Sequence, residues 1–163
     1  MKHRKIYIPK FTLIGLTVRT NNKNEMNPEV AKIGSLANYY WSNNVAKKIK
    51  HRLNPGVTYS VYTDFESDEH GEYTYFIGEA VDSIDGQDLS QFKVLTVSQS
   101  NYQKFTTDSG KMPDIVINAW HKIWSMKKDD FNGERTYITD FEIYDQRASD
   151  PNNAVVDIYI GIK

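Results

Sequence analysis

TDFE stands at residues 63–66 and again at residues 139–142. A looser match follows each copy, because YFIG at residues 75–78 resembles IYIG at residues 158–161. A four-residue identity can arise by chance, but each pair also falls at the same place in a repeated order of expected elements. Such a repeat indicates an internal duplication, in which two similar halves make up the chain.

The first half is expected to form a strand, a helix and two further strands. Residues 6–19 alternate in character like a strand, with a bend expected at Gly15. The sequence Asn-Pro-Glu at residues 27–29 is typical of a helix start, and that helix is expected to end before the next proline-glycine pair. Residues 58–65 and 73–81 then predict a hairpin around a polar turn.

The second half repeats this order. Residues 92–106 predict a strand with an irregularity near Asn101, and residues 113–127 predict a helix. Two more strands are expected at residues 136–145 and 155–162. The fold class predicted from the pattern is α+β.

Composition indicates one domain over residues 1–163, with half repeats at about residues 6–81 and 92–162. Twenty basic and twenty-one acidic residues leave a formal charge of −1, so no overall field attracts a phosphate backbone and direct nucleic-acid binding is not expected. The chain has no cysteine, which excludes disulfides and thiolate metal ligands. No export signal and no long apolar segment follow the basic start, so a cytoplasmic protein is expected, with residues 2–5 as a frayed strand start.

A carboxylate among aromatic residues is the sharpest signal of a site. Phe141 and Ile143 are expected to face the core, whereas Glu142 and Tyr144 face the other way. If that second face is open to solvent, Glu142 is an ordinary exposed acid. If it lines a cleft, the poorly hydrated carboxylate needs a cationic or hydrogen-bonding ligand, and a raised pKa would suit it to acid–base chemistry.

Tryptophans on both expected helices are further candidates. Trp120 and Trp124 are four residues apart and therefore lie on one side of the second helix, and Trp41 has a comparable place on the first. Core packing and cleft lining are both open for these rings. The four histidines are scattered and suggest no metal site, and no cofactor motif occurs.

The order of elements, together with five segments, resembles the GyrI-like effector-binding domain, which is also the C-terminal ligand-sensing part of AraC-type and MerR-type regulators. The segments are YSVY (59–62), EYTYFIGEAV (72–81), WHKIW (120–124), DFEIY (140–144) and VDIYI (156–160). The resemblance covers nearly the whole chain from Tyr7 onward. Regulators of this kind carry a helix-turn-helix domain before the module, for which this chain has no room, so it resembles the stand-alone branch.

The resemblance implies two strand-helix-strand-strand units that form a pseudo-twofold antiparallel sheet, with two helices and a central ligand cleft. A glutamate of the penultimate strand faces the cleft in this family, and Glu142 matches its position. Family ligands tend to be hydrophobic and are often cationic or aromatic. By position, the other ligand-binding candidates are Trp41, Tyr59, Trp120, Trp124 and Tyr144.

The leading prediction is a module that senses or sequesters a small amphipathic molecule. Because the stand-alone branch includes hydrolases of cyclopropane-bearing genotoxic compounds, the first alternative is a hydrolase that uses Glu142. The second alternative is a protein-interaction role, like that of gyrase inhibitors, with a topoisomerase or a separately encoded regulator as partner. The acidic stretch at residues 64–72 could supply such a surface, although a solvated loop also explains it.

Overall fold

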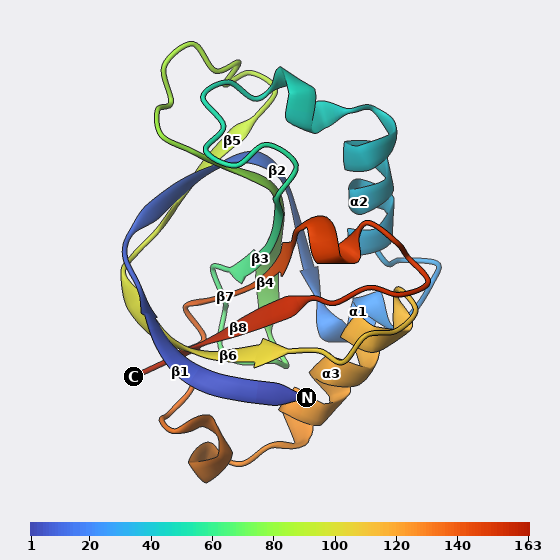
Figure 1. Cartoon of the computed structure of the whole chain (residues 1–163), viewed down its shortest axis with the longest axis vertical. Coiled ribbons are helices and arrows are strands. Elements are labelled where there is room, and N and C mark those ends of the chain that lie inside the picture. The colour runs from blue at the N-terminus through green and yellow to red at the C-terminus, as the bar shows by residue number, and fades with distance from the viewer.

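One antiparallel sheet of eight strands holds the molecule together (Figure 1). The computed structural model describes all residues, 1–163. The strands are β1 (Lys2–Ile8), β2 (Phe11–Asn21), β3 (Thr58–Thr63), β4 (Glu72–Val81), β5 (Lys93–Val97), β6 (Ser100–Thr106), β7 (Thr139–Tyr144) and β8 (Asp157–Ile162). Their order across the sheet is β1-β6-β8-β7-β3-β4-β2-β5.

This order contains the duplication that the sequence predicts. Counted outward from the centre, one side runs β7-β8-β6-β1 and the other runs β3-β4-β2-β5. The central pair joins the two copies of the repeated stretch, because Thr63 lies opposite Thr139 and their hydroxyl groups are hydrogen-bonded at 3.1 Å. The structure confirms the α+β class and the antiparallel sheet, while the bounds of the half repeats stay a prediction.

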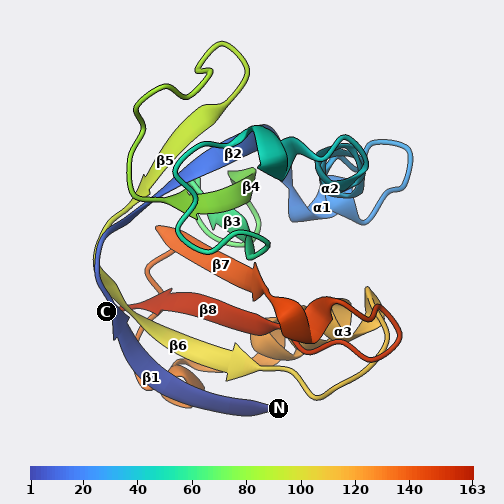
Figure 2. The ribbon, with the colours of Figure 1, turned by 45° about the horizontal axis from the view of Figure 1, so that its top comes forward.

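The helices lie against one face of the sheet (Figure 2). They are α1 (Asn22–Glu25), α2 (Ile33–Ser42) and α3 (Asp114–Ser125), with short 3-10 turns at Val45–Lys48, Lys128–Phe131 and Gln146–Ala148. On that face, α1 and α2 lie over the first half of the sheet and α3 lies over the second half, as Figure 2 shows. None of these helices combines the length and apolar character needed to cross a bilayer.

The core is divided in a way that leaves space at the centre. On the face away from the helices, one buried cluster draws side chains from β2 to β8, with partly buried residues of β1 against it. On the helix face there are two clusters, one between α2 and the first half of the sheet and one between α3 and the second half. Neither helical cluster covers the junction of β3 and β7.

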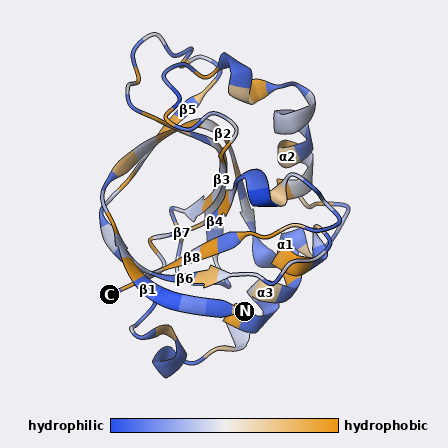
Figure 3. Ribbon diagram, viewed as in Figure 1, coloured by the Kyte–Doolittle hydropathy of each residue, from blue (hydrophilic) through white to orange (hydrophobic).

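The N-terminal strand differs from its expected form. It is two strands, interrupted at Pro9, because proline lacks the N–H that a ladder needs. Residues 2–5 are not frayed, since β1 pairs with β6 along its whole length, with Lys2 opposite Thr106. Most of β1 is hydrophilic and drawn in blue in Figure 3, as suits an edge strand. Gly15 lies within β2, opposite Gly78, where a Cβ would clash with the neighbouring backbone.

The helix start expected at residues 27–29 is wrong. Asn27 forms a turn instead, accepting a hydrogen bond from the backbone N–H of Glu29, and α2 begins only at Ile33. Glu25 from α1 provides the cap, because its carboxylate accepts bonds from the backbone N–H groups of Lys32 (2.9 Å) and Ile33 (3.0 Å). A distant carboxylate therefore fixes the start of α2, by the same satisfaction of free N–H groups that a local cap gives.

The strand expected over residues 92–106 is also interrupted. It forms β5 and β6, which separate at residues 98–99, close to the irregularity predicted near Asn101. β5 pairs with β2, whereas β6 pairs with β8, so the interruption lets one segment serve both halves of the sheet. The N-terminal segment also serves both halves, because β1 pairs with β6 and β2 pairs with β4.

Candidate ligand-binding site

A cavity of about 640 Å³ fills the space between α2 and α3. Its floor is formed by β3, β4 and β7, and 15 of its 25 lining residues are hydrophobic. The volume falls within the roughly 300–1,000 Å³ typical of sites for small molecules. The cavity therefore occupies the centre of the pseudo-twofold arrangement, where the family resemblance implies a cleft.

Glu142 lies in the middle of the floor. Side chains of β7 alternate, so that Phe141 enters the core on the far face while Glu142 points to the helix side. Only 2% of Glu142 is exposed, which rules out the interpretation of an ordinary exposed acid. A buried carboxylate needs compensation from its surroundings.

Three neutral donors supply that compensation. The Tyr62 hydroxyl and the Trp120 indole N–H donate to Oε2 of Glu142, at 2.8 and 2.6 Å. The Tyr144 hydroxyl donates to Oε1 at 2.5 Å. A carboxylate has about four lone-pair directions, so these bonds leave one direction free, on Oε1. The carboxylate is fixed in place by its neighbours and retains little hydrogen-bonding capacity for a ligand.

The charge of Glu142 is not neutralised by any basic side chain. It takes part in none of the ion pairs of the molecule. Burial raises the pKa of its carboxyl group above the ordinary value, and the hydrogen bonds from Tyr144, Trp120 and Tyr62 oppose part of that rise. Burial, together with the charge of Glu142, also raises the pKa of Tyr62 and Tyr144 well above that of free tyrosine, so both remain hydroxyl donors.

A second buried carboxylate in the cavity wall is paired. Asp140 accepts from Arg135 at 2.8 Å and from the backbone N–H of Gly161 at 2.8 Å. Burial raises the pKa of Asp140, and Arg135 opposes the rise. Glu25 and Glu69 also line the cavity, so its fixed charges are mostly acidic. No group of three or more His, Asp or Glu side chains is placed to hold a metal ion.

Five of the six candidates from the sequence lie around this cavity. They are Trp41, Trp120, Trp124, Tyr144 and Glu142, and the first three are all the tryptophans of the chain. Trp41 is 49% exposed and makes an edge-to-face contact with Tyr144, at 6.3 Å between ring centroids. Their binding roles stay a prediction, but their positions permit it.

Tyr59 is the exception. It lies on the opposite face of the sheet, among Phe11 and Phe141, so it does not line the cavity. The reason is the alternation of β3, which turns Tyr59 and Val61 to one face and Ser60 and Tyr62 to the other.

Sequence reasoning missed the residues that alternate with Tyr59. Tyr62 lies opposite Asp140 in the sheet and reaches Glu142, while Tyr75 on β4 lies opposite Tyr62 and its hydroxyl is 2.7 Å from Ser60 Oγ. The signal was present in the tyrosines at every second position of β4, Tyr73 and Tyr75, both of which line the cavity.

The acidic loop at residues 64–72 is also part of the wall. Phe65 and Glu69 line the cavity, and the backbone carbonyl of Glu69 accepts a bond from the Asn22 side chain at 3.0 Å. The expectation of a solvated loop agrees with the burial of this segment, none of which is fully buried, and the structure adds that two of its residues also line the cavity.

Known proteins are similar to this chain in sequence and in fold. The sequence profile of a family described as integron-associated effector-binding proteins, Cass2, matches residues 6–162. The chain belongs to this family. The match confirms the resemblance to GyrI-like effector-binding domains. The Bacillus subtilis (strain 168) protein YobU, named as a transcriptional regulator, is 31% identical over 152 residues, which cover 91% of this chain and 90% of YobU.

Solved structures agree with the assignment to the Cass2 family. The integron cassette protein VCH_CASS2 of Vibrio cholerae is 32% identical, with a TM-score of 0.75, and the match covers 99% of this chain and 95% of that one. SAV2435, solved bound to tetraphenylphosphonium, has a TM-score of 0.77 at 16% identity and covers 100% of this chain and 94% of its own. At that identity the second match shows the fold alone. This chain is thus a member of an effector-binding family.

Proposed function

We propose that the protein binds small apolar cations in the cavity around Glu142 and serves to sense or sequester them. The proposal rests on one observation, the buried carboxylate that no basic side chain neutralises. A bound cation would supply the missing opposite charge in a poorly hydrated place, where an ion pair is worth more than at the surface. SAV2435, which shares the fold, was solved with such a cation.

The hydrogen bonds of Glu142 favour a particular kind of cation. Since three donors already occupy the carboxylate, a primary ammonium group would leave donors without acceptors in an apolar cavity. A quaternary ammonium or phosphonium group has no donor to satisfy. The ligand class is therefore an aromatic or alkyl cation of permanent charge.

Aromatic side chains would supply most of the binding free energy. Trp41, Trp120 and Trp124 line the cavity, and Tyr73 and Tyr75 complete its wall. Burial of one aromatic ring contributes about 1.5–3 kcal/mol before ordering costs, so two or three rings support affinities on the order of micromolar. Ring surfaces discriminate poorly among ligand shapes, so we expect broad specificity with charge as the main filter.

The test is a titration with two ions of the same shape and opposite charge. Tetraphenylphosphonium and tetraphenylborate are added to the protein while tryptophan fluorescence is recorded, since all three tryptophans line the cavity. The proposal predicts saturable quenching by the phosphonium at micromolar concentration and at least tenfold weaker binding of the borate. Equal affinities, or tighter binding of the borate, would refute it.

Hydrolysis is the second candidate, because a buried carboxylate of raised pKa can act as a general base on a water molecule. The free lone-pair direction on Oε1 is the position for that water. Turnover of a strained electrophile such as an activated cyclopropane, lost in Glu142→Gln, would support this activity. Stoichiometric binding of the electrophile without product would exclude it.

A further inference from the structure

A second hollow adjoins the ligand cavity. It has a volume of about 990 Å³ and lies between the chain that leads into β3 and the loop that follows β7. The two cavities share Trp41, Met112 and Tyr144 in their linings. These three side chains are the wall between the two cavities, and Trp41 is half exposed.

Tyr144 contacts both Glu142 and another residue of this wall. Its hydroxyl group donates to Glu142 within the first cavity, and its ring contacts Trp41. Asp145, the next residue, already belongs to the lining of the second hollow. A ligand at Glu142 is therefore separated from the second hollow by one layer of side chains.

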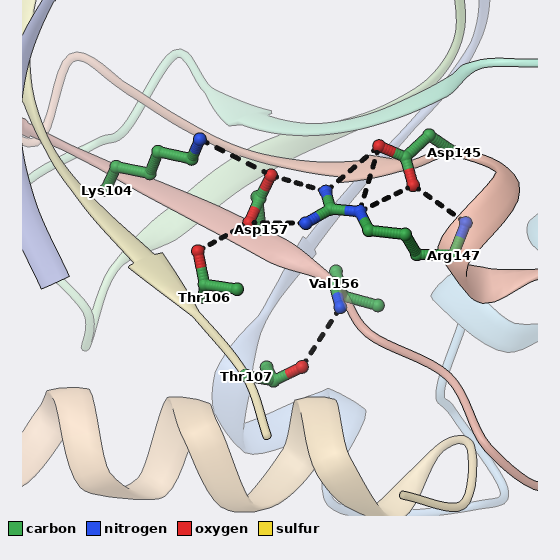
Figure 4. A network of polar contacts seen from close by, with 7 residues as sticks. All are labelled: Lys104, Thr106, Thr107, Asp145, Arg147, Val156 and Asp157. Atoms are coloured by element: carbon green, nitrogen blue, oxygen red, sulfur yellow. Dashed lines mark hydrogen bonds and ion pairs between the residues drawn. The ribbon is translucent and has the colours of Figure 1, made fainter. Parts of the chain in front are cut away.

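The outer wall of the second hollow is held by a network of polar contacts. Figure 4 shows Arg147 between Asp145 and Asp157, to which it is paired at 2.9 and 2.6 Å. Asp157 is buried at 4% exposure and also accepts from the Thr106 hydroxyl at 2.7 Å, with Lys104 3.7 Å away. The network ties the loop after β7 to β6 and β8, so the hollow does not depend on a mobile segment for its shape.

The chemical character of the second hollow differs from that of the first. Only 5 of its 13 lining residues are hydrophobic. Its two charged residues, Asp145 and Arg147, neutralise each other. Gln146 and Ser149 are exposed and have no side-chain partner, so they offer free hydrogen-bonding groups. Such a lining suits an uncharged group with donors and acceptors, and it suits neither a cation nor an alkyl chain.

We infer that the second hollow is a subsite for the same ligand, and that it receives a neutral hydrogen-bonding arm of an elongated cation whose charged apolar end lies beside Glu142. This inference rests on the proposed function, since it needs a cation in the first cavity. The ligand class thereby becomes more specific: a permanent cation with aromatic or alkyl groups at one end and a hydroxyl, amide or ether arm at the other. Trp41, Met112 and Tyr144 line both parts, so the arm would cross from one part to the other beside these three side chains.

The test uses three triphenylphosphonium probes that differ only in their fourth substituent. The substituents are a methyl group, a ten-carbon alkyl chain, and a ten-carbon chain that ends in a hydroxyl group. Ser149→Trp adds a bulky ring to the second hollow at a position that does not line the first cavity, and Asn152→Trp is the matched control, since Asn152 is exposed on the same loop and lines neither cavity. Dissociation constants are measured for each protein by isothermal titration calorimetry.

The inference predicts that Ser149→Trp weakens the hydroxyl probe about tenfold, the equivalent of roughly 1.4 kcal/mol, and leaves the methyl probe within about twofold. It also predicts that wild type binds the hydroxyl probe more tightly than the alkyl probe, and that Asn152→Trp changes none of these values. Unchanged binding of the hydroxyl probe in Ser149→Trp, with the methyl probe still bound, would overturn the inference alone. Failure of the methyl probe to bind wild type would overturn the proposed function and this inference with it.

Discussion

Replacing Glu142 with glutamine removes a negative charge from the cavity while it keeps the side chain's shape. Oε2 accepts from Tyr62 and Trp120, so the amide oxygen at this position can retain both bonds. The amide N–H₂ then faces the Tyr144 hydroxyl, which can rotate to accept. The variant is therefore expected to fold, with a change of less than about 1 kcal/mol in the free energy of unfolding at neutral pH.

The effect on binding follows from the lost charge. A cation centred on the order of 5 Å from the carboxylate gains about 3 kcal/mol at an effective dielectric constant of about 20. Displacement of water from both charges reduces this gain, which leaves about 2 kcal/mol, or roughly thirtyfold in affinity. Tetraphenylphosphonium should therefore bind Glu142→Gln about thirtyfold more weakly, and tetraphenylborate should bind it no more weakly than it binds wild type.

The assay is isothermal titration calorimetry of both ions with both proteins. It is done at pH 8 because the Glu142 carboxyl group, whose pKa is raised, is more fully ionised there than at lower pH. The control variant is Glu134→Gln, because Glu134 is exposed and does not line the cavity. An equal loss of affinity for both ions would indicate a damaged cavity instead of a lost charge. Unchanged binding of the phosphonium would refute the electrostatic reasoning.

Three further predictions concern the neighbours of Glu142. Tyr144→Phe removes one hydrogen-bond donor to the Glu142 carboxylate, so the pH at which phosphonium binding reaches half its maximum should rise by about one unit. Tyr59→Phe, on the far face of the sheet, should leave that pH unchanged. Identical pH profiles for Tyr144→Phe and wild type would contradict this prediction. Because burial raises the pKa of Glu142, the folded state binds more protons than the unfolded state once the pH exceeds the ordinary carboxyl pKa of 4.5. Urea titrations should therefore show that wild type loses stability relative to Glu142→Gln as the pH rises from that value through the folded-state pKa. A stability difference that instead grows in favour of wild type would contradict this prediction. Arg135→Ala leaves Asp140 buried without its partner and should cost about 3–5 kcal/mol in urea denaturation, part of which Asp140→Asn should restore in the double variant. A loss below about 1 kcal/mol would mean that this ion pair contributes little to stability.

The α+β class could be predicted from the sequence because its strands alternate and the order of its elements repeats. The repeated TDFE stretch marks the centre of the sheet, where Thr63 and Thr139 lie opposite each other. Beyond that residue the copies differ, because β3 ends at Thr63 and Asp64 has a positive φ, while β7 continues to Tyr144. The local identity therefore pointed to a duplication, but its two copies occupy different positions in the fold, the first at the end of β3 and the second within β7.

The start of α2 could not be predicted from local chemistry. Asn27 and its neighbours carry all the signals of a helix start, but Glu25 binds the free N–H groups of Lys32 and Ile33. Thr20 on β2 holds the same carboxylate at 2.6 Å. The cap is thus set by a tertiary contact, which no propensity of residues 27–29 records.

For the site, the sequence identified the carboxylate and the tryptophans but not the face of β3. Glu142 stands out because an acid between aromatic residues is unusual in the middle of a strand. Tyr59 and Tyr62 are equally aromatic, and periodicity alone does not state which of them faces the helices. Only the pairing with β7, which sets Ser60 opposite Glu142, decides the question.

Anomalous diffraction from a crystal soaked with tetraphenylarsonium tests the central claim most directly, since it locates the charged centre of the ligand. The account predicts one principal arsenic peak in the cavity between α2 and α3, beside the Glu142 carboxylate and the Trp120 ring, and a markedly weaker peak in Glu142→Gln at the same concentration. A principal peak elsewhere on the molecule, with the cavity empty at a concentration that saturates binding in solution, would contradict the account.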